Sequence, residues 1–289
     1  MPLTLSELML YGTTKLTRYN SGGVIGSGTG FVYNTTTSNE QHVPLIITNK
    51  HVLEGADQIG ITFHVADVTG TTPVPSGRTR DILLTLSSRG VVAHPDPEVD
   101  LCGLGIGDLL TEMQKQGNPI FTASLTRENI PDDTQWQNFD AIEDVIMVGC
   151  PNGLYDAVNK LPIVRAGITA THLAKQYAGK NVFIVDMACF PGSSGSPVFL
   201  SNSNPYVDRQ SGNFVMGGTR FFFLGVLYAG PTISNAGEIV MANNPSVQFS
   251  SMMHLGYVVR STEVLVLETM VESINAARTL AENSNAAST

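Results

Sequence analysis

The chain has 289 residues, of which 42% are hydrophobic and 14% are charged, and its formal net charge is −9. This apolar content is enough for a large core and excludes a wholly disordered protein. Because the net charge is negative and no cluster of Lys and Arg occurs, we expect neither nucleic acid nor an anionic membrane as a partner.

The first eleven residues predict a short helix and no export signal. They lack a cationic start, and two polar residues, Ser6 and Glu7, interrupt their apolar positions. Thr4 followed three residues later by Glu7 is typical of a capping box, which opens a helix. No run in the chain approaches the roughly 18 apolar residues that cross a bilayer.

Two sets of short strand-like runs follow, separated by polar turns. Apolar, alternating or β-branched stretches predict six strands at residues 14–19, 28–33, 44–48, 58–65, 82–92 and 101–106. A mixed, polar connection at residues 107–137 contains one short helical pattern at 108–116. The same signals predict six more strands at residues 141–149, 163–173, 181–188, 195–200, 219–228 and 254–259.

The last part of the chain changes its period from strand to helix. Apolar residues recur there at helical spacing, at Leu267, Met270, Val271, Ile274 and Ala277. Ser261 or Thr262 can cap the first turn, so we expect a helix over residues 263–281 and a frayed tail over 282–289.

Three segments carry groups suited to nucleophilic acyl transfer. His51 follows the apolar run LIITN, Asp100 precedes an apolar strand, and Ser194 lies in a Gly-Ser-Ser-Gly-Ser-Pro turn. This chemistry needs a hydroxyl, an imidazole that takes its proton, a carboxylate that orients the imidazole, and two N–H groups for the oxyanion. The backbone N–H groups of Gly192 and Ser194 can supply the oxyanion hole.

Other residues compete for two of these roles. Asp96 and Glu98 lie close to Asp100 in the sequence and are alternative carboxylates. His94 is an alternative imidazole, although it lies in a turn flanked by proline and His51 ends an apolar strand.

At these motifs the chain resembles the chymotrypsin/trypsin-like serine endopeptidases. The segment that ends at His51 (TNKH) resembles the family's Thr-Ala-Ala-His, and residues 192–197 (GSSGSP) resemble its Gly-Asp-Ser-Gly-Gly-Pro. Asp100-Leu101 resembles its Asp-Ile/Leu-Ala segment, and residues 26–31 (GSGTGF) resemble a hairpin of bacterial members that include the HtrA group. The order His, Asp, Ser also matches. No PDZ-like extension follows the last predicted strand.

This resemblance implies an all-β fold of two six-stranded antiparallel β-barrels, chymotrypsin-like, with a C-terminal α-helix. The N-terminal barrel is expected over residues 1–112, a connection over 113–137 and the C-terminal barrel over 138–262. The implied activity is that of a serine endopeptidase, which cleaves a polypeptide substrate through an acyl-enzyme. His51, Asp100 and Ser194 would form its triad.

Two departures from the family pattern concern regulation. Ser193 stands where digestive members carry an acidic residue that pairs with a newly freed N-terminus, and no internal activation motif occurs. We therefore expect no zymogen switch, and a regulatory protein partner is one alternative means of control. Ser196 replaces a second glycine after the nucleophile, a change between small residues that we expect to be tolerated.

The resemblance also implies where the substrate side chain before the cut is bound. The expected lining is uncharged and consists of Ala188, Phe190, Tyr228, Gly230 and Gly256. Three of these five side chains are small or absent, so we expect a deep apolar pocket and cleavage after Leu, Phe, Tyr or Met. In the alternative, an aromatic ring of the lining narrows the pocket, which would favour Ala or Val.

Two other functions fit parts of the sequence. An α/β-hydrolase esterase would use Ser194, Asp208 and His254 in that order, but it needs G-x-S-x-G and a parallel sheet with intervening helices. A pseudoprotease, which binds without turnover, is the non-enzymatic alternative.

The cysteines and histidines indicate neither a metal site nor a cofactor. Cys102, Cys150 and Cys189 are odd in number and lie in apolar stretches, which predicts buried free thiols and a cytoplasmic protein. No C-x-x-C or H-x-x-x-H spacing occurs, so we expect no metal ion.

Overall fold

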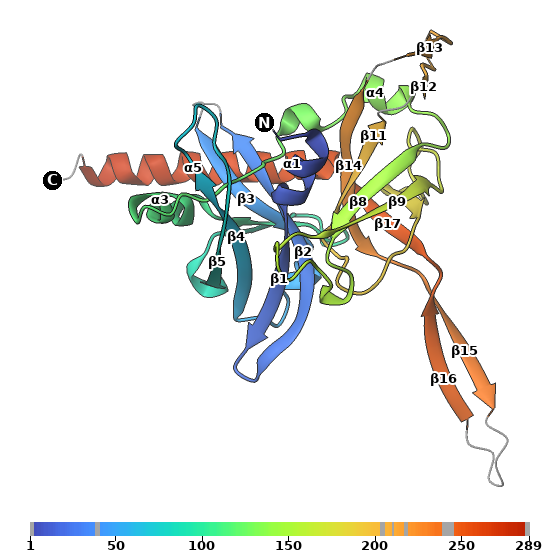
Figure 1. Ribbon diagram of the computed structural model, residues 1–289, viewed down its shortest axis with the longest axis horizontal. Coiled ribbons are helices and arrows are strands. Elements are labelled where there is room, and N and C mark those ends of the chain that lie inside the picture. Colours follow the sequence, from blue (N-terminus) through green and yellow to red (C-terminus); the bar gives the residue numbers. More distant parts are fainter. Residues whose placement is uncertain are drawn as a thin grey trace.

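A computed structural model describes residues 3–37, 41–202, 206–209, 211–216, 219–238 and 246–286 (Figure 1). The N-terminal half forms a seven-stranded antiparallel sheet in the order β5-β4-β1-β2-β3-β7-β6. Its strands are β1 (Thr13–Asn20), β2 (Gly23–Thr36), β3 (His42–Thr48), β4 (Gln58–Asp67), β5 (Val74–Thr85), β6 (Val91–Ala93) and β7 (Cys102–Gly105).

This sheet has one strand more than the six that were predicted. The run at residues 82–92 is divided by the 3₁₀ turn η1 (Leu86–Ser88), where the Ser88 hydroxyl donates to the Thr85 carbonyl at 3.0 Å. The local hydrogen bond of a serine competes with the strand ladder, so a stretch that reads as one strand forms β5 and β6.

The C-terminal half is a closed barrel of six strands in the order β10-β17-β14-β11-β8-β9, which agrees with the predicted number. These strands are β8 (Asp144–Gly149), β9 (Ile163–Thr169), β10 (Val182–Asp186), β11 (Pro197–Asn202), β14 (Arg220–Ala229) and β17 (Leu255–Arg260). The all-β, chymotrypsin-like architecture with a C-terminal helix is thereby confirmed.

Two hairpins were not predicted. The first is short and pairs β12 (Tyr206–Val207) with β13 (Phe214–Val215). The second pairs β15 (Thr232–Glu238) with β16 (Ser246–Met252) and projects away from the barrel (Figure 1).

The helices are α1 (Leu5–Gly12), α2 (Lys50–Leu53), α3 (Gly107–Lys115), α4 (Asp133–Asn138) and α5 (Thr262–Ala286). The predicted capping box of α1 is confirmed, with the Glu7 N–H donating to the Thr4 hydroxyl at 3.3 Å. Helix α5 extends five residues beyond the predicted 263–281, and residues 287–289 of the predicted tail lie outside the described residues. No described helix has the length and apolar content needed to cross a membrane.

One apolar core joins the two halves. Helix α5 starts beside the barrel and runs across the N-terminal sheet (Figure 1), where Val264, Leu267 and Val271 are buried. They pack in a cluster that contains Tyr33 of β2 and Val226 of β14, so both halves share this core. The Tyr33 hydroxyl also donates to Glu268 Oε1 at 2.8 Å.

Candidate active site

His51 is positioned by the junction of a buried strand with a single helical turn. Strand β3 ends at Thr48, and α2 begins two residues later. The Asn49 side chain donates to the Asp100 carbonyl oxygen at 2.6 Å, which ties this junction to the chain before β7. The imidazole of His51 is 42% exposed, so a substrate can reach it.

Asp100 holds His51 through two hydrogen bonds. The His51 backbone N–H donates to Asp100 Oδ1 at 3.1 Å, and Nδ1 of its ring lies 2.5 Å from Oδ2. Because an ionised carboxylate only accepts hydrogen bonds, Nδ1 carries the ring proton and Nε2 is left as a base. Burial alone would raise the pKa of Asp100, but the hydrogen bonds and charge of His51 outweigh it and lower the pKa below its usual value.

The competing residues are engaged elsewhere. His94 is buried, and its Nε2 lies 2.9 Å from Glu263 Oε2 on α5. The Glu98 carboxylate pairs with Lys180 at 2.9 Å, and the Asp96 carboxylate accepts from the Glu98 N–H, also at 2.9 Å. The structure therefore brings His51 together with Asp100 and not with these alternatives.

Ser194 lies in a turn whose conformation requires glycine on both sides. The Ser193 N–H donates to the Phe190 carbonyl at 3.0 Å across the turn, and Gly192 has φ of +82°. Gly195 has φ of +87°, and a Cβ there would lie 1.9 Å from the Thr29 carbonyl oxygen. Only glycine fits this approach, which explains the Gly-Ser-Ser-Gly pattern.

Two backbone N–H groups beside Ser194 point away from the hydrogen bonds that hold the turn. The Pro191 carbonyl accepts from the Asn152 N–H at 2.6 Å, which directs the following N–H, that of Gly192, to the opposite side. Within the part of the chain that the structure describes, neither the Gly192 N–H nor the Ser194 N–H has an acceptor. The Ser194 hydroxyl donates to the Tyr228 carbonyl at 3.4 Å and not to His51.

Two residues that sequence reasoning missed hold this turn. Thr29 of β2 is fully buried, and its hydroxyl donates to the Gly192 carbonyl and accepts from the Cys150 N–H, both at 3.0 Å. Arg165 of β9 donates from Nη2 to the buried Ser193 hydroxyl at 3.0 Å and from Nη1 to the Ala188 carbonyl at 2.5 Å. Nothing local in the sequence marks these contacts, because they join residues 23 to 163 positions apart.

A small cavity of about 80 Å³ adjoins Ser194. Its lining is apolar apart from the nucleophile and consists of Cys189, Phe190, Pro191, Ser194, Leu227, Ala229 and Gly230. Of the five predicted lining residues, Phe190 and Gly230 border the cavity, and Ala188, Tyr228 and Gly256 do not.

Larger side chains fill the space beside Gly256. A Cβ at Gly256 would meet the Cys189 Sγ and a Leu227 methyl group, each at 2.6 Å. Burial raises the pKa of the Cys189 thiol to about 11, so it stays protonated and packs as an apolar group.

The antiparallel pairing of all strands in the described ranges contradicts the α/β-hydrolase alternative, which needs a parallel sheet. Asp208 lies in the β12–β13 hairpin, where its carboxylate accepts from the Ser211 hydroxyl. The described residues also contain no group of three or more His, Cys, Asp or Glu side chains arranged around a common metal position.

Residues 28–205 match the family model of the trypsin-like peptidase domain. The chain is similar to the serine endoprotease from Yersinia pestis, with 15% identity over 94% of this chain and 68% of that one and a TM-score of 0.48. It is also similar to the thermostable serine protease AL20 from an extremophilic microorganism, with 12% identity, 92% and 99% coverage and a TM-score of 0.47. A third similar structure is the MamO protease domain from Magnetospirillum magneticum, with 13% identity over 90% of this chain and 97% of that one and a TM-score of 0.43.

A search of curated protein sequences finds no match to the chain. The family model nevertheless covers more than half of it, and the matched segment contains His51, Asp100 and Ser194. The chain therefore belongs to the trypsin-like peptidase domain family and is a trypsin-like serine protease.

Proposed function

We propose that the protein is a serine endopeptidase whose catalytic triad is Ser194, His51 and Asp100. The observation that carries this proposal is the hydrogen-bonded His51–Asp100 pair together with a nucleophile turn that leaves two N–H groups unpaired. Such donors, fixed before the substrate arrives, stabilise an oxyanion at no cost of reorganisation.

The reaction proceeds in two acyl-transfer steps. His51 Nε2 takes the proton of the Ser194 hydroxyl as its oxygen attacks the substrate carbonyl, and returns that proton to the leaving amine. Water then attacks the acyl-enzyme with the same imidazole as its base, which releases the acid product and restores the hydroxyl. The N–H groups of Gly192 and Ser194 bind the oxyanion in both steps.

In the resting enzyme the Ser194 hydroxyl must turn before it can react. Its hydrogen bond to the Tyr228 carbonyl is long, at 3.4 Å, and is therefore weak. We propose that the hydroxyl exchanges this acceptor for His51 when substrate binds, because catalytic hydrogen bonds commonly tighten only then.

We propose that the residue before the cut is a small apolar one, such as Ala or Val. A cavity of about 80 Å³ whose floor is filled by Cys189 and Leu227 supports this preference over Leu, Phe, Tyr or Met. Its lining has no charged side chain to pair with a buried Lys, Arg, Asp or Glu of the substrate.

The test combines turnover with active-site labelling. Ser194→Ala should lower the hydrolysis of peptide amides by about six orders of magnitude and abolish labelling by a fluorophosphonate probe. Ser88→Ala, in the turn η1, is the matched control and should leave both unchanged. Failure of the natural protein to react with the probe under any condition would support the pseudoprotease alternative instead.

We further propose that the isolated chain is already competent and works in a reducing compartment such as the cytoplasm. The hydrogen bonds from Thr29 to the Gly192 carbonyl and from Arg165 to the Ser193 hydroxyl support competence without a partner, because they hold the turn without a newly freed N-terminus. Three free, buried cysteines support the reducing compartment. Labelling of the purified protein by the fluorophosphonate without any partner is the expected result.

A further inference from the structure

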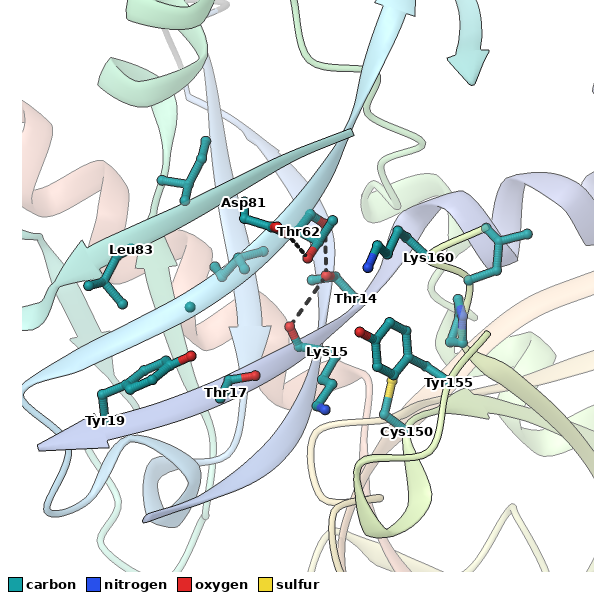
Figure 2. A pocket seen from close by; sticks show the side chains of 15 residues that line it. Thr14, Lys15, Thr17, Tyr19, Thr62, Asp81, Leu83, Cys150, Tyr155 and Lys160 are labelled. Carbon is teal, nitrogen blue, oxygen red and sulfur yellow. Dashed lines mark hydrogen bonds between the residues drawn. The ribbon is translucent and has the colours of Figure 1, made fainter. Parts of the chain in front are cut away.

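A second cavity, of about 450 Å³, lies between the N-terminal sheet and the loop that leads from β8 to β9 (Figure 2). One wall consists of residues of β1, β4 and β5, among them Thr14, Lys15 and Thr62, and the other of Tyr155 and Lys160. None of these residues belongs to the proposed triad or to the cavity beside Ser194.

Two lysines converge on one aromatic ring in this cavity. The ammonium of Lys15 lies 4.7 Å from the centroid of the Tyr155 ring, and that of Lys160 lies 5.6 Å from it. Figure 2 shows the ring between the two lysines, with its hydroxyl directed into the cavity. Both lysines are half-buried. In the described part of the chain, neither ammonium has a carboxylate within ion-pair distance.

The backbone fixes Lys160 in this position. Its φ is +58°, a left-handed conformation that is rare for a residue with a side chain. A tight loop imposes it: the Lys160 N–H donates to the Asp156 carbonyl at 2.7 Å, and the Asp156 N–H donates to the Leu161 carbonyl at 2.8 Å. The Lys160 backbone also hydrogen-bonds the His64 imidazole of β4, which ties the loop to the N-terminal sheet.

Two ammonium groups that share one aromatic ring, and that pair with no carboxylate among the described residues, would attract an anion. The carboxylate on the wall, that of Asp81, accepts a hydrogen bond from the Thr62 hydroxyl at 2.5 Å and does not pair with either lysine. The protein as a whole has a net charge of −9, so this small cationic site stands out against its surroundings.

The cavity is connected to the active site through Gly153. A Cβ on Gly192 would lie 3.2 Å from the Gly153 N–H, and a Cβ on Gly153 would lie 3.3 Å from the Lys15 ammonium. The small cavity beside Ser194, which we propose for the residue before the cut, is lined by Phe190 and Pro191. A substrate that binds there and extends past Gly192 would pass Gly153 and reach Lys15.

We propose that Lys15 and Lys160 bind an acidic side chain of the polypeptide substrate, two to four residues after the cut. This rests on the proposed endopeptidase function and specifies its substrate class. An extended chain advances about 3.3 Å per residue. A Glu or Asp two to four positions beyond the scissile bond can therefore reach past Gly153, and the volume exceeds what a single inorganic anion needs.

The first experiment compares matched peptides. Each pair carries Ala before the cut and either Glu or Gln at one of the four positions after it. For the natural protein, kcat/KM at low salt should be about 3 to 10 times higher for Glu at one of the second to fourth positions, and the ratio should fall as salt screens the charges. A substrate with Ala joined to an aminocoumarin, which has no residue after the cut, reports the proposed function alone.

Three lysine variants separate the site from net charge. Lys15→Gln and Lys160→Gln should bring the Glu/Gln ratio close to one and leave cleavage of the aminocoumarin substrate unchanged. Lys115→Gln removes the same charge from an exposed position of α3 and should keep the full ratio. The double variant Lys15→Glu/Lys160→Glu should prefer Lys over Glu after the cut.

A binding measurement keeps the inference independent of turnover. Full-length Ser194→Ala protein should bind a fluorescent Glu peptide about 3 to 10 times more tightly than its Gln counterpart, and this difference should vanish on adding Lys15→Gln. If the natural protein cleaves nothing but this difference is found, the endopeptidase function fails and the site stands. Equal binding and equal kcat/KM for every pair would overturn the site, as would activation of aminocoumarin cleavage by inorganic phosphate without any peptide preference.

Discussion

Replacing Thr29 with Val tests whether one hydroxyl of the N-terminal sheet holds the oxyanion hole in place. The side chains have nearly the same shape, but Val cannot donate to the Gly192 carbonyl or accept from the Cys150 N–H. Each of these buried groups loses its partner at a cost of about 1–3 kcal/mol. The free energy of unfolding should therefore fall by about 2–6 kcal/mol.

The effect on catalysis follows from the same two hydrogen bonds. If about 1–2 kcal/mol of the loss falls on the turn, the equilibrium constant that favours the ordered turn drops about 5- to 30-fold. We expect kcat for a peptide amide to fall by up to that factor, with KM little changed, because the oxyanion contact is made in the transition state.

Urea unfolding and steady-state kinetics on the same preparations provide the assay. Thr35→Val is the control: Thr35 is also buried on β2, and its hydroxyl donates to the Val43 carbonyl at 3.3 Å, away from the turn. It should lose stability and keep kcat. A Thr29→Val enzyme that is destabilised but has the kcat of the natural protein would refute the reasoning.

Variants at three further positions probe the same site. Arg165→Met keeps the apolar stem of the side chain but removes the hydrogen bonds to the Ser193 hydroxyl and the Ala188 carbonyl, so kcat should fall about tenfold or more. Arg165→Lys should restore part of this loss. Equal kcat for both variants and the natural enzyme would contradict this role. Asp100→Asn should lower kcat about 10⁴-fold. Because the pKa of Asp100 is lowered by folding, its contribution to stability is present above about pH 4, the ordinary pKa of the group, and is lost at lower pH. The unfolding free energies of variant and natural protein should therefore converge as the pH falls below about 4; a constant gap would show another cause. Cys189→Gly should enlarge the small cavity beside Ser194. In a peptide library randomised at the residue before the cut, the cleavage preference should then shift from Ala and Val toward Leu and Met. An unchanged preference would mean that Cys189 does not limit the pocket.

The candidate site residues that the sequence predicts are those whose signal is local. His51, Asp100 and Ser194 each end or begin a recognisable strand or turn, and the two glycines beside Ser194 are required by their positive φ angles. Six barrel strands were predicted because alternation and β-branched residues mark them directly.

The parts that were missed depend on contacts between distant segments. Thr29 and Arg165 act on a turn more than twenty residues away, and no spacing rule identifies such partners. The lining of the small cavity also depends on such contacts, because Cys189 occupies the space that Gly256 leaves, although the two residues are far apart in the sequence. Packing of this kind is decided by side-chain volume in three dimensions and not by residue type along the chain.

The shared core beneath α5 has a consequence for the timing of folding during synthesis. Val264, Leu267 and Val271 complete the cluster that joins the N-terminal sheet to the barrel, yet they leave the ribosome after every strand of both halves. A nascent chain that contains His51, Asp100 and Ser194 but ends before α5 therefore lacks the helix that packs against both the N-terminal sheet and the barrel. The core that joins the two halves can therefore form only after α5 has been synthesised.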